Sequence, residues 1–366
     1  MEGPYSARFP SSPAGEKSRR APVFRGAAHE RTHSLRSPRT VNTCIMDRPS
    51  EHDFVHRPVM AHEIVEAFAP VPAGWVIDAT LGGAGHSTLL LDQHPHLCVL
   101  GIDQDPDALA VARARLARFG DRVLTVQARF DAITSVVSEQ LSDDAGIVGV
   151  LFDLGVSSPQ LDRAERGFSY RLDAPLDMRM DPSQTLSAAI VVNEYDESEL
   201  VRVLRDNGDE RFAVRIARAI VAARPVLTTV QLAESVRDAI PAPARRRGGH
   251  PAKRSFQAIR IEVNAELDVL SVALRSAIDL LEIDGRVAVL SYHSGEDRIV
   301  KQILREAETG GCTCPTGLPC VCGAIGTIEL IRRGGVTPTA MESADNPRSE
   351  SARLRVARRR VSKAVR

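Results

Sequence analysis

The stretch Trp75-Val-Ile-Asp-Ala-Thr-Leu-Gly-Gly-Ala-Gly-His-Ser-Thr-Leu-Leu-Leu91 decides the fold of this chain. A short apolar run ends at Asp78, the chain turns through Gly82, Gly83 and Gly85, and a second apolar run with the composition of a helix follows. A strand, a glycine turn and a helix in this order present backbone N–H groups where the helix begins. The stretch therefore predicts a βα unit that binds a ligand.

The flanking segments extend this unit into a sheet. We expect strands at 97–103, 122–127, 147–154 and 284–293, and helices at 62–68, 87–93, 106–119 and 296–308. Alternation at this spacing is typical of a doubly wound parallel sheet. Residues 327–332 and 353–357 are candidates for a closing antiparallel pair. The predicted fold class is α/β, Rossmann-like and doubly wound.

The sheet pattern is interrupted between residues 157 and 267, where the sequence contains polar loops and helices but no good strand. An insertion of this length can hold a small core of its own. We therefore expect an N-terminal extension at 1–50, a first part of the sheet domain at 51–156, an all-helical inserted lobe at 157–267 and a second part of the sheet domain at 268–366.

The N-terminal extension is rich in Arg, Pro, Ser and Gly and is expected to be disordered. It is either an arm that binds nucleic acid or a dispensable extension upstream of an alternative start at Met46, and the composition favours the second.

Composition narrows the class of protein. The 366 residues carry 47 basic and 47 acidic side chains, and the basic ones gather in the N-terminal arm, at 245–260 and at 353–366. Local patches, rather than net charge, would have to attract a polyanion. No apolar run approaches the roughly 20 residues that span a bilayer, and no secretory signal is visible. We expect a cytoplasmic protein without a membrane partner.

The end of the second strand indicates a nucleoside cofactor. Asp103 is placed to accept hydrogen bonds from both hydroxyls of a ribose. The turn contains Gly83-x-Gly85, but Thr88 stands where a dinucleotide site has its third glycine. S-adenosylmethionine carries no phosphate and needs only close approach of the backbone. A tight βα turn without a ligand is the remaining alternative.

The end of the fourth strand favours S-adenosylmethionine. Its sequence, Asp153-Leu-Gly-Val-Ser-Ser-Pro-Gln160, resembles the acid-Pro-Pro-aromatic signature of amino-group methyltransferases. An exocyclic amine conjugated to a ring is a weak nucleophile, so its site needs acceptors that align the lone pair and receive a proton. This turn contains no Cys, which argues against methylation of carbon through a covalent adduct.

Eight motifs together resemble one family. They are His56-x-Pro-Val-Met, Asp78-Ala-Thr-Leu-Gly-Gly-Ala-Gly-His-Ser, Gly101-Ile-Asp-Gln-Asp, Asp153-Leu-Gly-Val-Ser-Ser-Pro-Gln-Leu-Asp, Arg166-Gly-Phe-Ser, Pro175-Leu-Asp-Met-Arg-Met-Asp, Phe256-Gln-Ala-Ile-Arg-Ile-x-Val-Asn-x-Glu-Leu and Tyr292-His-Ser-x-Glu-Asp-Arg. From about residue 53 onward the chain resembles the bacterial small-subunit (16S) ribosomal RNA (cytosine-N4)-methyltransferases. The resemblance implies S-adenosylmethionine as cofactor and an N4-methylcytidine in the decoding region of the 30S subunit as product.

The resemblance also assigns site residues by matching position. It implies cofactor contacts at Ala84, Gly85 and His86 in the turn, Asp103 at the ribose, Phe130 beside the adenine, and Asp153 and Gln160 at the closing edge. Asp153 is the candidate catalytic residue, because it could orient the target amine or the cofactor. Two alternatives stay open from the residues alone: Phe130 as a plain core aromatic, and His86 as a helix-start residue without a ligand.

The helical insertion is the candidate RNA-facing lobe. Its stretch Arg245-Arg-Arg-Gly-Gly-His-Pro-Ala-Lys-Arg254 contains no acid and suits phosphate contacts, although a solvated loop is the alternative. Gln160 replaces the aromatic residue of the amino-methyltransferase signature, so Phe168 or Tyr170 are candidates to stack on the target base.

Two further features lie outside this assignment. Gly295 stands where the family usually has Leu, and it is expected to loosen the turn after the fifth strand. The acidic loop with Asp173, Asp177 and Asp181 has no assigned role unless it contacts a base or organises Arg171 and Arg179.

Cys312-x-Cys314 and Cys320-x-Cys322 place four thiols within eleven residues. Four thiolates could hold zinc, but the spacing is tighter than usual, so structural zinc and an unliganded, oxidisable loop remain equal alternatives and no metal site is predicted.

Two other functions compete with methyl transfer. One is a non-catalytic RNA-binding or ribosome assembly factor with a vestigial cofactor pocket, and the other is a nicotinamide-dependent oxidoreductase. Retention of Asp103, Asp153 and Gln160 together favours the methyltransferase.

Overall fold

The computed structural model describes residues 58–360 except 158–159, 161–162, 247–248 and 316–320. All of these residues belong to one compact unit, Val55–Arg366. The prediction of a disordered N-terminal extension lies outside the described residues.

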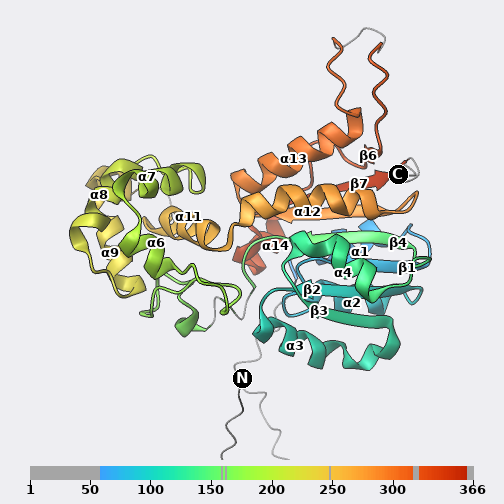
Figure 1. The fold of residues 1–366 in the computed structure, drawn as a ribbon, viewed down its shortest axis with the longest axis horizontal. Coiled ribbons are helices and arrows are strands. Elements are labelled where there is room, and N and C mark those ends of the chain that lie inside the picture. Colours follow the sequence, from blue (N-terminus) through green and yellow to red (C-terminus); the bar gives the residue numbers. More distant parts are fainter. Residues whose placement is uncertain (1–57, 158–159, 161–162, 247–248, 316–320, 361–366) are drawn as a thin grey trace, which may run out of the picture. The chain divides into compact units, whose positions relative to one another are not determined.

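The described residues form a seven-stranded sheet in the order β3-β2-β1-β4-β5-β7-β6 (Figure 1). Its strands are β1 (Gly74–Asp78), β2 (Leu97–Asp103), β3 (Val123–Gln127), β4 (Ile147–Asp153), β5 (Arg286–Ser291), β6 (Ile328–Leu330) and β7 (Arg353–Arg359). The first five are parallel. Their order reverses between β1 and β4, which opens a crevice beyond the carboxyl ends of these strands.

The expected closing pair is confirmed, with one addition. β6 and β7 pair antiparallel, and β7 also pairs antiparallel with β5, so it lies between β5 and β6. The sheet is therefore mixed rather than wholly parallel. Its five parallel strands confirm the α/β doubly wound class.

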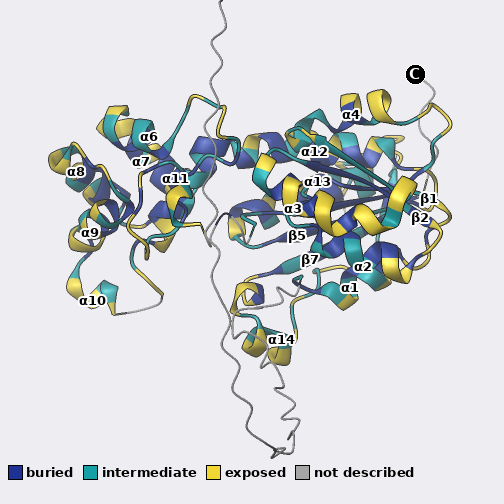
Figure 2. Cartoon of the chain, turned by 90° about the horizontal axis from the view of Figure 1, so that it is seen from below, coloured by how far each residue is buried: buried dark blue, intermediate teal, exposed yellow. Residues whose placement is uncertain are grey.

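Helices cover both faces of the sheet. One face carries α1 (Ala61–Phe68), α2 (Gly85–Gln93) and α3 (Pro106–Leu116), and the other carries α4 (Ile133–Gln140), α12 (Glu266–Leu280) and α13 (Ser294–Thr309). Neighbouring strand residues point to opposite faces, so Val76 packs with α1 while Ile77 packs with α12. Burial on both faces explains the continuous apolar run of β4, whose first six residues are all buried. In Figure 2 the strands between the two layers of helices are largely dark blue, while the outer faces of the helices are yellow.

One short 3-10 helix follows α3 in the chain, and another follows β3. The predicted helix 106–119 appears as α3 to Leu116 and continues as η1 (Ala117–Arg122), within which Gly120 has a non-helical φ of 55°. Phe130 opens η2 (Phe130–Ala132) directly after β3.

A second hydrophobic cluster belongs to what we call the helical lobe. The helical lobe comprises α6 (Ala188–Glu194), α7 (Glu197–Asp206), α8 (Ala213–Ala223), α9 (Thr229–Ala239), α10 (Ala242–Arg245) and α11 (Lys253–Asn264). The buried residues of its hydrophobic cluster all lie between Phe168 and Val263. Capping boxes begin α7 and α9. Within the described part of residues 157–267 no strand forms.

The lobe ends at a sharp backbone turn. Ala265, with a φ of 50°, ends α11 and precedes α12, which packs on the sheet. The division of the chain into four segments stays a prediction.

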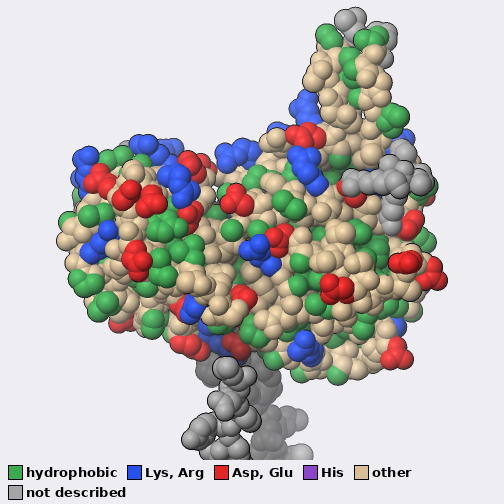
Figure 3. All heavy atoms as spheres, in the orientation of Figure 1, with side chains coloured by type: hydrophobic (Ala, Val, Ile, Leu, Met, Phe, Trp, Pro, Cys, Tyr) green, Lys and Arg blue, Asp and Glu red, His purple; other side chains and the backbone are tan. Residues whose placement is uncertain are grey.

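The remaining short elements are η3 (Ala164–Arg166), α14 (Ala340–Asp345) and η4 (Pro347–Ser349). No helix among the described residues has the length and apolar character needed to cross a membrane. Acidic and basic side chains are interspersed over the face shown in Figure 3, in keeping with the balanced net charge.

Candidate functional site

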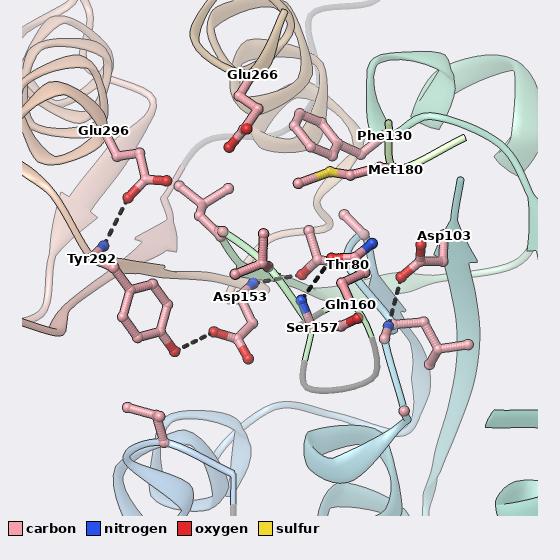
Figure 4. A pocket seen from close by; sticks show the side chains of 18 of the residues that line it. Thr80, Asp103, Phe130, Asp153, Ser157, Gln160, Met180, Glu266, Tyr292 and Glu296 are labelled. Carbon is pink, nitrogen blue, oxygen red and sulfur yellow. Dashed lines mark hydrogen bonds between the residues drawn. The ribbon is translucent and has the colours of Figure 1, made fainter. Parts of the chain in front are cut away.

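A cavity of about 530 Å³ lies at the carboxyl ends of β1, β2, β4 and β5. Its floor includes the glycine turn after β1, and Met180, Lys253 and Gln257 of the helical lobe add a second wall. Figure 4 shows the side chains that converge there. The cavity lies where the strand order reverses, which is where open α/β sheets bind ligands.

The glycine turn holds its backbone in left-handed conformations. Gly82 has a φ of 51° and Ala84 a φ of 59°, which is uncommon for a residue with a Cβ. Gly85 opens α2 and packs so tightly against Pro58 that a Cβ there would lie 2.7 Å from its Cγ. Within the described part of the chain no side chain caps α2, so its first N–H groups have no side-chain acceptor there. Gly85 and His86 line the cavity, whereas Ala84 is fully buried and does not.

Asp103 joins the second strand to the glycine turn. Its Oδ2 accepts a hydrogen bond from Gly82 N at 2.7 Å and its Oδ1 accepts one from Asp105 N at 2.9 Å. Burial raises the pKa of this carboxyl to about 6. Each carboxylate oxygen can accept a further hydrogen bond. The side chain can therefore fix the turn and still bind hydroxyl groups in the cavity (Figure 4).

Asp78 is a site residue that the sequence reasoning did not single out. It ends β1, lines the cavity and accepts a 2.6 Å hydrogen bond from Ser87 Oγ through Oδ2. Burial raises its pKa to about 6, against the lowering effect of the Ser87 hydrogen bond. The available signal was its position, since Asp78, Asp103 and Asp153 each end a parallel strand.

Asp153 is held from three sides. Its Oδ1 accepts a 2.6 Å hydrogen bond from Tyr292 Oη, its Oδ2 lies 3.5 Å from His86 Nε2, and its backbone N–H donates to Thr80 Oγ1 at 2.6 Å (Figure 4). Burial, reinforced by the adjacent Asp153 charge, raises the pKa of Tyr292 well above its ordinary value. Tyr292 therefore stays a neutral donor to this carboxylate.

The His86 ring is buried, with Nε2 facing Asp153 Oδ2 at 3.5 Å, and neither ring nitrogen forms a hydrogen bond to any residue that the structure describes. Buried polar atoms are normally satisfied. His86 also lines the cavity, next to the Asp153 carboxylate.

Phe130 and Gln160 lie at two edges of the same cavity. The half-buried ring of Phe130 contacts Phe152 edge-to-face at 5.9 Å, so it is both a core aromatic and a cavity wall. Gln160 is buried, donates to Asp105 Oδ2 at 2.9 Å and accepts from Ser157 N at 2.9 Å. The structure thus brings six of the seven predicted cofactor residues to one cavity. Their contacts with a cofactor stay predictions.

The wall opposite the glycine turn contains two acids with fixed partners. Arg260 and Glu266 form a bidentate ion pair with both N–O distances at 2.8 Å. Glu296 Oε2 accepts hydrogen bonds from the backbone N–H groups of Tyr292 at 2.7 Å and His293 at 3.2 Å. Glu296 and His293 form the capping box that begins α13. Gly295 lies in this first turn, and the expected loosening stays a prediction.

Phe168 and Tyr170 are not among the residues that line the cavity, and stacking of either ring on the target base stays a prediction. Phe168 is buried in the helical lobe, and Tyr170 stacks on His250 with ring centroids 4.4 Å apart. Neither lines the cavity, because their apolar rings pack into the lobe's own core. In the acidic loop, Asp177 binds Arg179 through both oxygens at 2.8 Å, so this acid does organise one of the two arginines.

Comparison with known proteins identifies the family. The sequence model of the MraW methylase family matches residues 53–360. The ribosomal RNA small subunit methyltransferase H of Heliobacterium mobile is 49% identical over 84% of this chain and 99% of its own length. The proteins of the same name from Thermobifida fusca and Mycolicibacterium smegmatis are 52% and 50% identical, over 83% and 84% of this chain and 93% and 84% of their own lengths.

These matches confirm the resemblance drawn from the eight motifs and the expectation of a methyltransferase. With more than four-fifths of its length matched at about half identity, the chain belongs to the MraW methylase family.

Proposed function

We propose that this chain transfers a methyl group from S-adenosylmethionine to the exocyclic N4 amine of a cytidine in small-subunit (16S) ribosomal RNA, within the decoding region. The observation that carries the proposal is the Asp153 carboxylate, held by Tyr292 at the rim of the cavity that the glycine turn lines. The name shared by relatives of about 50% identity supports the substrate class.

The residues present fit the cofactor. The N-terminus of α2 at Gly85 would offer backbone N–H groups to the methionine part, and the buried ring of His86 would lie beside it. Asp103 would accept hydrogen bonds from the ribose hydroxyls, Phe130 would lie beside the adenine, and Gln160 would close the edge. When bound, S-adenosylmethionine supplies an electrophilic methyl group on a sulfonium, which is already a good leaving group.

Asp153 would then act on the target amine. Because Tyr292 binds Oδ1, we assign Oδ2 to the incoming N4–H group. A hydrogen bond at this oxygen aligns the amine lone pair and holds the proton that the amine releases. Alignment of this kind carries a large share of the rate when the leaving group needs no further activation.

The helical lobe would bind the RNA. Lys253, in the basic stretch 245–254, begins α11 and lines the cavity, where the target base would have to enter. A lysine there suits a phosphate contact, and such contacts dominate affinity for nucleic acids. We assign the lobe to the insertion 157–267, flanked by the two parts of the catalytic domain at 51–156 and 268–366, and we place the enzyme in the cytoplasm on 30S particles.

The experiment is methylation of 30S particles from a strain that lacks this protein, with labelled S-adenosylmethionine and mass-spectrometric mapping of the nucleosides. We expect one new N4-methylcytidine, and its absence would refute the proposal. Asp153→Ala is expected to abolish transfer while RNA binding persists. If the wild-type protein binds RNA without methyl transfer, it is an assembly factor instead.

A further inference from the structure

The segment between α13 and β6 projects from the molecule as two arms (Figure 1). Gly310 ends α13 with a φ of 62°, and a Cβ there would lie 2.4 Å from the carbonyl oxygen of Ile325 on the returning arm. Thr327 N–H donates to Ala307 O at 2.8 Å at the same level. Direct backbone contact thus fixes the base of the projection.

Beyond this base the described residues of the two arms form no apolar core. Val321 is 88% exposed and Ile325 71% exposed. The described residues of both arms, 311–315 and 321–325, contribute nothing to the hydrophobic clusters of the chain. In Figure 3 the projection stands clear of the surface. Small segments that cannot build a core are usually held by a cross-link or a metal ion.

Three thiols meet between the arms. The Sγ atoms of Cys312 and Cys314 on the outgoing arm and of Cys322 on the returning arm all lie within 4.8 Å of one another. Those of Cys312 and Cys322 are 3.5 Å apart. We call these three residues the thiol cluster.

The spacing within the thiol cluster suits a tetrahedral metal. Zinc binds thiolates at about 2.3 Å, which separates two of them by about 3.8 Å. A disulfide bond requires about 2.05 Å, well below the 3.5 Å between Cys312 and Cys322. The cluster consists of cysteines alone, and soft thiolate ligands select zinc over magnesium or calcium.

We propose that the thiol cluster binds one Zn²⁺ ion that ties the two arms of the projection together. Binding replaces the thiol protons, which pass to solvent, and creates no redox change. Cys320 lies outside the described residues, and the proposal depends only on Cys312, Cys314 and Cys322. The role is structural, since none of the three lines the cavity.

The first test is the metal content of the full chain, purified without chelator and measured by elemental mass spectrometry. We expect about one zinc per chain, and a loss of at least tenfold in Cys312→Ser and in Cys322→Ser. The double variant Cys44→Ser/Cys98→Ser, which keeps every cysteine of the projection, is the matched control and should keep its zinc. Thermal melting and S-adenosylmethionine binding report whether each variant folds.

A second readout does not depend on activity. Removal of zinc by a chelator should raise the rate of proteolytic cleavage within residues 311–325 and leave S-adenosylmethionine binding unchanged. Replacement by cobalt should give the visible absorption of a tetrahedral, thiolate-rich site.

Three outcomes would overturn the proposal. Absence of metal with all six cysteines reactive after unfolding would show an unliganded loop. Absence of metal with fewer reactive cysteines would show a disulfide. Iron with a visible charge-transfer band would show a different metal centre.

Discussion

Replacement of Tyr292 by Phe tests whether the Tyr292 hydroxyl positions Asp153, while the other side chains of the cavity stay unchanged. The change deletes one oxygen and keeps the ring that packs behind the site. It removes the 2.6 Å hydrogen bond from Tyr292 Oη to Asp153 Oδ1. Because burial raises the pKa of Tyr292 well above its ordinary value, the wild-type hydroxyl donates this bond throughout the usable pH range.

The size of the effect follows from the type of bond. A hydrogen bond to a charged group contributes about 1.5–3 kcal/mol. If Asp153 aligns the amine in the transition state, loss of this energy lowers kcat roughly 10- to 150-fold, at about 1.4 kcal/mol for each factor of ten. The affinity for S-adenosylmethionine should stay within about twofold, because Asp103 and the glycine turn keep their own hydrogen bonds.

The assay is single-turnover methylation of 30S particles, with cofactor binding measured separately by calorimetry. Tyr195→Phe is the matched control, since Tyr195 Oη also donates to a carboxylate, Glu262 Oε1 at 3.3 Å, but does not line the cavity. It should retain full cofactor affinity and a rate within about threefold of wild type. A Tyr292→Phe rate that is equally close to wild type would refute the role given to the Tyr292–Asp153 hydrogen bond.

Three other predictions follow from the same site. Asp103 has a pKa of about 6 without ligand, so the affinity for S-adenosylmethionine should fall as the pH drops through 6. The variant Asp103→Asn should bind the cofactor weakly at every pH, and calorimetry measures both effects. Lys253→Ala should weaken RNA binding and reduce the salt slope by about one, whereas Lys301→Ala on α13 should not. Glu266→Ala should lower the free energy of unfolding by about 3–5 kcal/mol, because Arg260 is left unpaired in a largely buried position; denaturant titration measures this.

Each of these has a clear contrary result. A binding constant that does not change between pH 5 and 7 would remove Asp103 from the ribose contact. An unchanged salt slope in Lys253→Ala would place the RNA elsewhere. Stability equal to wild type in Glu266→Ala would show that the Arg260–Glu266 pair is solvated and weak.

The sequence by itself determined the parallel core and the position of its ligand site. Strand-terminal acids such as Asp103 and Asp153 could be placed because successive strands of a βα pattern end at the same edge of a sheet. The glycine turn could also be predicted from the sequence, because a left-handed backbone, as at Gly82, favours glycine. Local periodicity and turn chemistry carry this information without reference to distant residues.

Only the tertiary structure decided which distant side chains meet these acids. Tyr292 is 139 residues from Asp153, and no spacing rule connects them. The tertiary structure also decided that Lys253 reaches the cavity from the helical lobe. It likewise decided the position of Tyr170, a candidate to stack on the target base, whose ring stacks on His250. The position of β7 between β5 and β6 could not be predicted from the sequence either, because strand order depends on packing between distant segments. Residue patterns report which face of an element is buried, but the neighbour that covers it is set by the packing of the whole chain.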